Sequence, residues 1–445
     1  MQIKILRVFL YGDPIGRIFS YGDLIRFVAD LGIGVAREDG SAWPIMSLSM
    51  LASNPDAQAA LWANVKSPLF NAQGGRLPTF FQNLLPEGVL RKHIAALRGC
   101  AENDHFDLLA ACGKHLPGAV TVGFEDVTDK QLQRLVTQDN DALEVSVVAM
   151  PIPDAISVSG MQPKLALVKV GTRYVHRTKN GQGTRIIAKL PVVGQPFMPL
   201  LEHMALELAR AAGVTTCHTS LARLSDIDSL QGYTLPQETE FLCVHRFDRD
   251  GAEHLHFEDF AQILNVDPKD KYTLSYAAIA QVLMTQPSMG EPAVHELVRR
   301  LVVHELLGNP DGHLKNFGVL YVRDLQGCKP TFAPAFDVVP YAISQGIDGH
   351  ALPLVPKPKT SSHGTNKRAV QLFTPASIRE FCTLVRIQDF SVRQTIKACC
   401  ALAEQHWPAL IEASGLPDVW RAKLMARLTG HPLLKPSRKV IAVGV

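Results

Sequence analysis

A polar segment inside an otherwise apolar region carries the residues best suited to chemistry. It reads LLGNPDGHLKNFGVL, residues 306–320, and four residues separate Asp311 from Asn316. This D-x-x-x-x-N spacing suits phosphoryl transfer, in which an aspartate accepts the proton of a hydroxyl nucleophile and an amide oxygen helps to hold Mg²⁺. The alternative is an Asn/Asp-rich turn between a helix and a strand, which is a common structure.

Two further residues extend the phosphoryl-transfer interpretation. Lys315 could face the transferred phosphoryl group, and Asp337 follows two strand-like segments that RDLQGCKP joins. Mg²⁺ accepts a few protein oxygens together with phosphate oxygens and water, so Asn316 and Asp337 would suffice as protein ligands. The sequence therefore predicts a metal aspartate after a hairpin.

Residues upstream could serve ATP in the order that a kinase requires. Lys189 ends the strand-like run RIIAK, and Glu202 follows thirteen residues later in the helix-periodic EHMALELARAA. Kinases use a strand lysine on the ATP phosphates and a helix glutamate as its ion-pair partner. Earlier still, ISVSGMQPKLAL, residues 156–167, places a Ser/Gly turn where backbone N–H groups could cover phosphates. Each feature also has an ordinary alternative, a solvated surface charge or a simple turn.

Other chemistries are less well supported. The chain has no G-x-x-x-x-G-K-[ST] motif, and GQGTRI at 181–186 lacks the third glycine of a dinucleotide turn. HELLG at 304–308 has a glycine where H-E-x-x-H needs its second histidine, so His304 is interpreted as helix packing. His218 has no ligand partners at metal spacing.

Composition sets outer limits on the protein class. At 445 residues with 47% hydrophobic and 20% charged side chains, the chain is expected to form about two or three globular domains. The net charge of +3 is too small to predict nucleic-acid binding by itself. The eight cysteines form no CxxC pair and predict reduced core residues. No apolar run approaches the roughly 18 residues of a membrane span, and the first residues lack a signal-peptide layout, so we predict a cytoplasmic protein without membrane contact.

The elements that must position these residues change in type along the chain. LRVFLYGDPIGRI predicts an early hairpin, and the polar stretch at 125–144 predicts a domain connection. After Val145 the runs are strand-like, with one helix at 199–212, whereas after about residue 250 most segments, including FEDFAQIL, predict helices. The predicted fold is α+β, with a strand-rich lobe followed by a helical lobe. The predicted domains are an N-terminal subdomain at 1–125, the strand-rich lobe at 126–247, the helical lobe at 248–433 and a tail at 434–445.

With these residues assembled, the chain resembles the HipA family, the serine/threonine kinase toxins of bacterial toxin–antitoxin pairs. FFQNLLPEG and LPGAVTVG resemble the N-terminal subdomain of that family. Six further segments resemble the kinase core of that family and occur in the same order: ISVSGMQPKLAL, IIAKLP, VHRFDRD, HFEDFAQ, GNPDGHLKNFGVL and APAFDVVP. The resemblance covers nearly the whole chain and implies a two-lobed, protein-kinase-like fold of the HipA and PI3/4-kinase type.

The resemblance implies a role for individual residues. Asp311 becomes the catalytic base with Lys315 beside it, and Asn316 and Asp337 become Mg²⁺ ligands. Ser157 matches an autophosphorylated serine of the family, with Ser159 as a second candidate. The residues implied at the ATP site are Lys189, Glu202, Val244, His245, Arg246, His313 and the loop residues Ser157, Val158, Ser159 and Gly160.

Partners and departures also follow from the resemblance. Family members are usually restrained by a HipB-like helix-turn-helix antitoxin that binds operator DNA, and their known substrates are aminoacyl-tRNA synthetases. His245 stands where some relatives have an acidic residue, and Pro310 precedes the catalytic aspartate, which puts nucleotide affinity and rate in question. Two rival functions stay open, a weakly active kinase-like scaffold that acts as a DNA-bound co-repressor, and a kinase of a small molecule or lipid.

Overall fold

The computed structural model describes most of the chain as two compact units whose segments alternate along the sequence. The described residues are 2–30, 46–52, 54–64, 66–123, 144–145, 164–175, 185–191, 195, 197–228, 240–250, 253–324, 327–356 and 371–434. The first unit takes its residues from Met1–Val192, Ala222–Lys271 and Gly318–Ala333, and the second from Val193–Leu221, Tyr272–Phe317 and Pro334–Val445. The domain boundaries at 125, 247 and 433 stay predictions.

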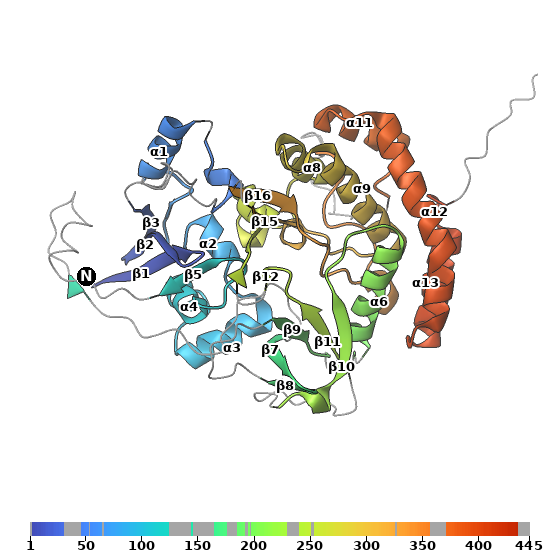
Figure 1. The fold of residues 1–445 in the computed structure, drawn as a ribbon, viewed down its shortest axis with the longest axis horizontal. Coiled ribbons are helices and arrows are strands. Elements are labelled where there is room, and N and C mark those ends of the chain that lie inside the picture. Colours follow the sequence, from blue (N-terminus) through green and yellow to red (C-terminus); the bar gives the residue numbers. More distant parts are fainter. Residues whose placement is uncertain are drawn as a thin grey trace, which may run out of the picture. The chain divides into compact units, whose positions relative to one another are not determined.

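The N-terminal part of the first unit is a sheet covered by short helices (Figure 1). Its strand order is β4-β3-β2-β1-β5, and β6 pairs with β1. The strands are β1 (Gln2–Leu10), β2 (Asp13–Tyr21), β3 (Leu24–Ala29), β4 (Asn71–Ala72), β5 (Val120–Gly123) and β6 (Glu144–Val145). The helices are η1 (Leu48–Met50), α1 (Pro55–Ala63), α2 (Thr79–Asn83), α3 (Gly88–Arg98) and α4 (His105–Cys112).

The early hairpin predicted from LRVFLYGDPIGRI is confirmed. β1 and β2 pair antiparallel from Ile3–Tyr21 to Leu10–Asp13, and the turn residues Tyr11 and Gly12 both have positive φ. Two positive φ angles are typical of the tight turns whose twist matches that of the flanking strands. The apolar faces of these strands pack on Phe70, Phe80 and Phe81 in one buried core.

A second sheet carries the predicted ATP lysine. Its order is β10-β11-β9-β7-β8, with the strands β7 (Lys164–Val170), β8 (Arg173–Val175), β9 (Ile186–Lys189), β10 (Thr219–Arg223) and β11 (Glu240–His245). The short helix η2 (Leu224–Asp226) follows β10. In the register of this sheet, Lys189 lies opposite Lys164 on one side and Leu242 on the other.

One secondary-structure prediction in the first unit is wrong. FEDFAQIL was predicted as a helix, but its first three residues belong to strand β14 (His256–Asp259), and only α7 (Phe260–Ile263) is helical. The side chain of Asp259 caps the helix in a capping box with Gln262, which fixes where the strand stops. β14 pairs with β15 (Gly318–Asp324), and β15 with β16 (Gly327–Phe332), so the predicted hairpin before Asp337 is confirmed. The remaining elements are β12 (Arg249–Asp250), β13 (Glu253–His254) and η3 (Pro268–Asp270).

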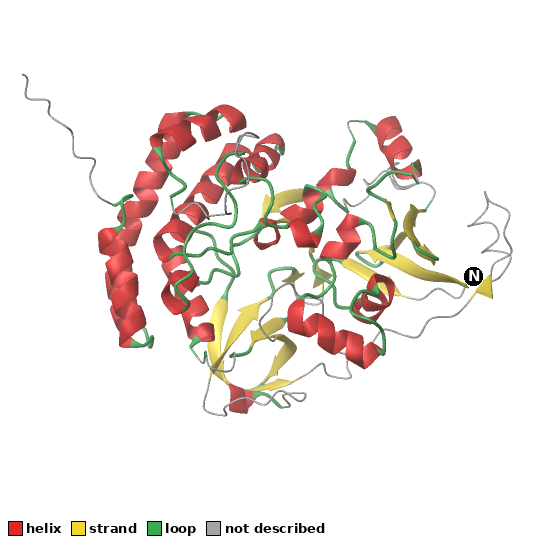
Figure 2. Ribbon diagram, turned by 180° about the vertical axis from the view of Figure 1, so that it is seen from behind, coloured by secondary structure: helices red, strands yellow, loops and turns green. Residues whose placement is uncertain are grey.

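The second unit is mainly helical (Figure 2). Its helices are α6 (Met198–Ala211), α8 (Tyr276–Thr285), α9 (Gly290–Leu307), η4 (Leu314–Asn316), α10 (Tyr341–Ser344), α11 (Pro375–Val385), α12 (Asp389–Ala413) and α13 (Asp418–Gly430). The central helix is α9, which packs against α6, α8, α12 and α13. Nearly all of its side chains from Ala293 to Leu307 are buried. A helix that is buried on most sides gives the loop that follows it a rigid starting point.

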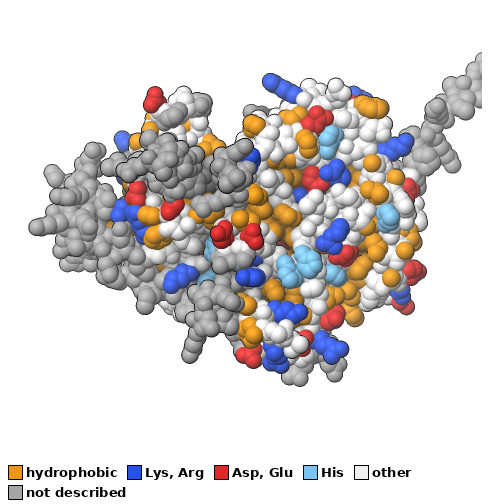
Figure 3. Space-filling model, in the orientation of Figure 1, with side chains coloured by type: hydrophobic (Ala, Val, Ile, Leu, Met, Phe, Trp, Pro, Cys, Tyr) orange, Lys and Arg blue, Asp and Glu red, His pale blue; other side chains and the backbone are white. Residues whose placement is uncertain are grey.

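Three general features complete the description. None of the helices in the described part of the chain is long and apolar enough to span a membrane. The seven cysteines whose side chains the structure describes form no disulfides, as predicted. On the face drawn in Figure 3, charged side chains of both signs are interspersed with hydrophobic ones among the described residues, without an extended area of one charge.

Candidate active site

The polar segment after α9 begins at a turn that only glycine fits. α9 ends at Leu307, and Gly308 follows it with φ 72°. The N–H groups of Gly308 and Asn309 both donate hydrogen bonds to the carbonyl of His304 at 2.9 Å. A Cβ on Gly308 would lie 2.4 Å from Cβ of Ala342. The chain must therefore leave the helix in a left-handed conformation and without a side chain at this point.

The loop closes around the main chain of Asp311. Asn309 Oδ1 accepts the N–H of Asp311 at 3.1 Å, and the carbonyl of Asp311 accepts the N–H of His313 at 2.8 Å. The same carbonyl accepts Nδ2 of Asn316 at 2.7 Å. The two residues of the D-x-x-x-x-N spacing are thus brought into direct contact. The backbone of Asp311 is fixed, while its side chain stays only partly buried.

The oxygen ligands present fit Mg²⁺. Nδ2 of Asn316 donates a hydrogen bond to the carbonyl of Asp311, so the atom of this side chain that can bind a cation is its oxygen, Oδ1. Asp337 adds a carboxylate, and its φ of 58° is a left-handed conformation that a non-glycine residue rarely adopts. Amide and carboxylate oxygens are the hard ligands that Mg²⁺ prefers. Among the described residues, no set of three or more His, Cys, Asp or Glu side chains could hold a metal ion.

The segment around Asp337 is tied to the same part of the second unit. The N–H of Ala335 is donated to the carbonyl of Thr215 at 2.8 Å, and the N–H of Cys217 to the carbonyl of Ala335 at 2.9 Å. After Asp337, the N–H of Ala342 is donated to the carbonyl of Gly308 at 3.1 Å. The segment that carries Asp337 is therefore joined to the start of the loop after α9 by one backbone hydrogen bond, between Ala342 and Gly308.

Two tyrosines that the sequence analysis did not identify support the loop. Tyr272 Oη donates to Asp311 Oδ1 at 2.6 Å, and Tyr276 Oη donates to the carbonyl of Gly312 at 2.8 Å. Burial raises the pKa of Tyr276 above its usual value, so its hydroxyl stays a donor at neutral pH. Both tyrosines lie 35 or more positions before their partners, and no spacing rule joins residues so far apart.

The other predicted residues of the second unit are buried. Lys315 lies in η4 with 2% of its surface exposed, and His313, the residue just before η4, is 3% exposed. Glu202 lies on α6 and is 1% exposed, which excludes its alternative interpretation as a solvated surface charge. A glutamate is almost never so deeply buried unless its charge is compensated.

In the first unit, Lys189 is the last residue of β9 and is 5% exposed, so it too is no solvated surface lysine. Val244 and His245 end β11. The guanidinium of Arg246 forms an ion pair with Asp248 at 2.6 Å. The backbone N–H of Arg246 donates a hydrogen bond to the carbonyl of Arg185.

The charges next to this strand end belong to a buried structural cluster. Arg246 and Arg249 both bond to Asp248, and their guanidinium groups also reach the carbonyl of Leu116. Burial alone would raise the pKa of Asp248, but the two guanidinium groups hold it well below its usual range. The Ser/Gly turn at 157–160 lies outside the described residues.

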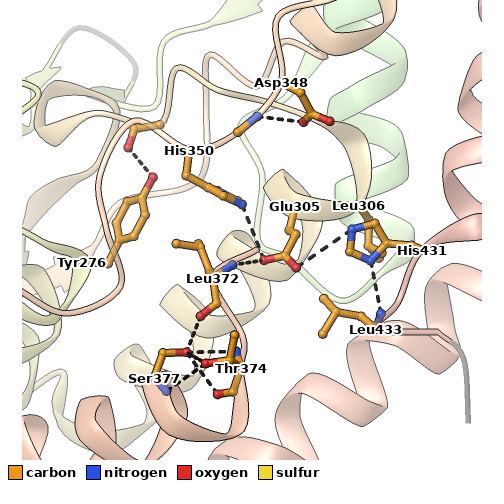
Figure 4. Close-up of polar contacts among 12 residues, drawn as sticks. Tyr276, Glu305, Leu306, Asp348, His350, Leu372, Thr374, Ser377, His431 and Leu433 are labelled. Carbon is orange, nitrogen blue, oxygen red and sulfur yellow. Dashed lines mark hydrogen bonds and ion pairs between the residues drawn. The ribbon is translucent and has the colours of Figure 1, made fainter. Parts of the chain in front are cut away.

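A buried polar network lies around the last turn of α9 (Figure 4). Glu305 Oε2 accepts the N–H of Leu372 at 2.8 Å and lies 3.5 Å from Nε2 of His350. Nε2 of His431 lies 4.0 Å from Oε1 of the same carboxylate. Burial, with His350 and Arg300 nearby, lowers the pKa of His304 to about 3 and keeps it neutral. This network joins the end of α9 to three segments that are distant in sequence.

Comparisons with known proteins show the family to which the chain is similar. The family model of the HipA N-terminal domain matches residues 6–123, and that of the HipA-like C-terminal domain matches residues 156–407. Y4dM of Sinorhizobium fredii (strain NBRC 101917 / NGR234), a protein named provisionally as a kinase, is 32% identical over 79% of this chain and 81% of its own length. A second protein of that organism named in the same way, Y4mE, is 29% identical over 58% of this chain and 63% of its own length.

The fold is also similar to that of a solved structure. HipA of Shewanella oneidensis MR-1, in complex with HipB and its operator DNA, has a TM-score of 0.66 to this chain. The two are 17% identical, and the match covers 96% of this chain and 97% of that one. The predicted α+β fold of the HipA type is confirmed.

Proposed function

The chain belongs to the HipA family, and we propose that it is an ATP-dependent protein kinase that phosphorylates serine or threonine hydroxyls. The observation that carries this proposal is the closed loop from Asn309 to Asn316. There, the carbonyl of Asp311 accepts the side-chain amide of Asn316 while the Asp311 carboxylate stays accessible. A base and a metal ligand held together by one hydrogen bond are what phosphoryl transfer to a hydroxyl needs.

Each residue has a separate task in this proposal. Asp311 orients the acceptor hydroxyl and takes its proton. Asn316 and Asp337 hold Mg²⁺, which when bound neutralises charge on the phosphates of ATP. Lys189 contacts the ATP phosphates, and Lys315 faces the transferred group. Because His313 and Lys315 are almost fully buried in the second unit, they cost little side-chain entropy to position.

We also propose that the kinase phosphorylates itself at Ser157 or Ser159. A phosphate adds about −1.5 to −2 charges. A loop carrying that charge would be repelled from the ATP phosphates and would be attracted to basic side chains instead. The modification would thus switch the enzyme off.

We propose the partner and the substrate by analogy with the family. The S. oneidensis HipA was solved with HipB and operator DNA, which supports a HipB-like helix-turn-helix partner for this chain, and DNA contact through that partner. A translation component such as an aminoacyl-tRNA synthetase is the proposed substrate. The rival scaffold function requires the same partner but no phosphoryl transfer, so both functions predict the complex and only the kinase predicts its chemistry.

One experiment separates them. The purified protein and its Asp311→Ala variant are dephosphorylated, incubated with Mg-ATP and analysed by peptide mass spectrometry. We expect phosphate on Ser157 or Ser159 in the wild type alone. If neither protein gains phosphate although both bind ATP, the kinase proposal fails and the scaffold function takes its place.

A further inference from the structure

Tyr272 is a side chain that contacts the carboxylate of the proposed base directly. It lies between η3 and α8, and its Oη donates to Asp311 Oδ1 at 2.6 Å. That distance falls in the short range that is typical of a hydroxyl bonded to an ionised carboxylate. Asn309 and Asn316, in contrast, bond to the main chain of Asp311. Different residues thus form hydrogen bonds with the main chain and with the side chain of Asp311.

The ring of Tyr272 makes a second contact with the same loop. It meets the imidazole of His313 edge to face, with ring centroids 5.1 Å apart and an interplanar angle of 84°. Tyr272 is nevertheless 44% exposed, whereas His313 is 3% exposed. Burial alone therefore does not explain the position of the ring, and its contacts with Asp311 and His313 contribute to it.

The backbone after Tyr272 adopts a costly conformation. Leu274 has φ 67° and is 47% exposed, and the left-handed region costs a leucine about 1–2 kcal/mol. The chain is then anchored by Tyr276 and Ala277, whose N–H groups are donated to the carbonyls of Pro353 and Leu354. Strained residues of this kind persist where the surrounding structure requires them, often at functional sites.

We propose that Tyr272 is a positioning residue for phosphoryl transfer, whose hydrogen bond to Oδ1 of Asp311 holds the carboxylate in the orientation that the acceptor hydroxyl needs. This inference rests on the proposed function of Asp311. Tyr272 keeps its own proton throughout, and the proton of the acceptor passes to the carboxylate of Asp311. A carboxylate held by this hydrogen bond has fewer orientations to lose when the acceptor binds, which lowers the barrier of the transfer step.

The first test compares Tyr272→Phe with the wild type in phosphoryl transfer. The variant keeps the ring and its contact with His313 but loses the hydroxyl. We expect kcat to fall about 10-fold while KM for ATP stays unchanged, because the hydroxyl acts on the transfer step. Tyr21→Phe, which removes the hydroxyl of a partly buried tyrosine at the end of β2, serves as the control with unchanged kinetics.

A kcat for Tyr272→Phe that equals or exceeds that of the wild type would overturn the proposal. A higher value would mean that the hydroxyl occupies the place of the acceptor instead of preparing it. Loss of ATP binding in this variant would also overturn it, because the effect would then lie outside the transfer step.

A second measurement needs no activity and separates this proposal from the proposed function. In protein labelled with ¹³C at the ζ carbon of tyrosine, the signal of Tyr272 is identified by its absence from Tyr272→Phe. We expect Asp311→Asn to shift that signal, because the hydroxyl loses a charged acceptor. An unchanged signal would show that the contact is absent in solution and would overturn the proposal whether or not the protein is a kinase.

Discussion

At the scale of single residues, Gly312 shows how closely the proposed catalytic loop is packed. A Cβ on Gly312 would lie 2.7 Å from Nδ1 of His304 and 3.2 Å from Oη of Tyr276. Gly312→Ala must therefore displace the buried histidine or the loop. We expect the free energy of unfolding to fall by about 1–3 kcal/mol, as in other overpacked sites, and phosphoryl transfer to fall at least 10-fold.

The measurements for Gly312→Ala are thermal unfolding and the rate of phosphoryl transfer. Gly430→Ala is the matched control, since a Cβ there would meet nothing within 4 Å. If Gly312→Ala behaved like Gly430→Ala in both measurements, the packing of the loop against His304 would be wrong.

The sequence predicts contacts between near neighbours in this loop but not contacts with residues far away along the chain. The spacing of Asp311 and Asn316 predicted their proximity, because a loop of a few residues can place only near neighbours together, and the structure joins them by a hydrogen bond. Tyr272 lies 39 positions before Asp311 and is exposed. Its role depends on where α8 packs beside α9, which no local pattern encodes.

At the scale of elements, β14 carries a carboxyl group whose ionisation opposes folding. Glu258 is fully buried, and its Oε1 accepts the N–H of Leu48 at 2.9 Å and the hydroxyl of Tyr321. Within normal hydrogen-bond geometry, Oε2 accepts no hydrogen bond from the residues that the structure describes. Burial raises the pKa of Glu258 to about 7 from its usual 4.5, because the charged form loses its hydration.

The sign of the resulting pH dependence follows from linkage. Between pH 4.5 and 7 the folded protein holds the proton of Glu258 and the unfolded chain does not. The stability due to this group is therefore complete below pH 4.5 and is lost as the pH rises through 7. His256 acts in the opposite direction, because burial lowers its pKa to about 4. Comparison of the wild type with a Glu258 variant isolates the contribution of Glu258 to the pH dependence of stability.

We expect Glu258→Gln to be more stable than the wild type at pH 8 by about 1–3 kcal/mol and nearly equal to it at pH 5. The amide keeps an acceptor for Leu48 and Tyr321 without a buried charge. The measurement is the free energy of unfolding in urea at both pH values. Glu253→Gln, on the exposed part of β13, is the control and should show no pH-dependent difference. A destabilised Glu258→Gln at pH 8 would mean that the carboxylate is ionised and well compensated in the folded protein.

A second prediction concerns how α13 holds the end of α9. Arg427 donates Nη2 to the carbonyl of Glu305 at 3.0 Å and Nε to that of Leu306 at 3.2 Å, while Nη1 pairs with Asp348 at 2.7 Å. The last carbonyls of a helix need such partners. We expect Arg427→Ala to lower the free energy of unfolding by about 2 kcal/mol, since hydrogen bonds with charged groups contribute about 1.5–3 kcal/mol.

Thermal unfolding with a paired variant tests this prediction. Arg393→Ala removes a partly exposed ion pair with Asp389 on α12, which should contribute about 0.5 kcal/mol. Equal losses in the two variants would show that Arg427 does not cap α9.

The elements were largely predictable wherever local signals agree. The β1–β2 and β15–β16 hairpins have turn residues between apolar runs, and α6 has a helical period that ends at Gly213. The prediction for FEDFAQIL was wrong because its first three residues lie in β14, which is fixed by pairing with β15, about 60 positions later. Long-range pairing overrides local preference, so a strand of four residues before a short helix had no local signal of its own.

At the scale of the whole molecule, the proposed function assigns nucleotide and metal contacts to separate residues that can be tested one at a time. Lys189→Met removes a charge and keeps an apolar stem of similar length. Asp337→Asn keeps a residue type that tolerates the left-handed conformation at φ 58°, so it tests the charge without straining the backbone. Both variants should fold as the wild type does without ligand.

ATP at about 100 times its Kd should stabilise the wild type by about 2.7 kcal/mol, seen as a rise in the midpoint of thermal unfolding. For the wild type, we expect ATP to raise this midpoint more in the presence of Mg²⁺ than in EDTA.

Lys189→Met should lose most of the ATP-induced rise both with Mg²⁺ and in EDTA, because the lysine is proposed to contact the phosphates. Asp337→Asn should lose only the part that Mg²⁺ adds. Lys397→Met, on the exposed side of α12, should respond as the wild type does. A full rise in Lys189→Met would remove this lysine from the ATP site, and a full Mg²⁺ effect in Asp337→Asn would remove that carboxylate from the metal.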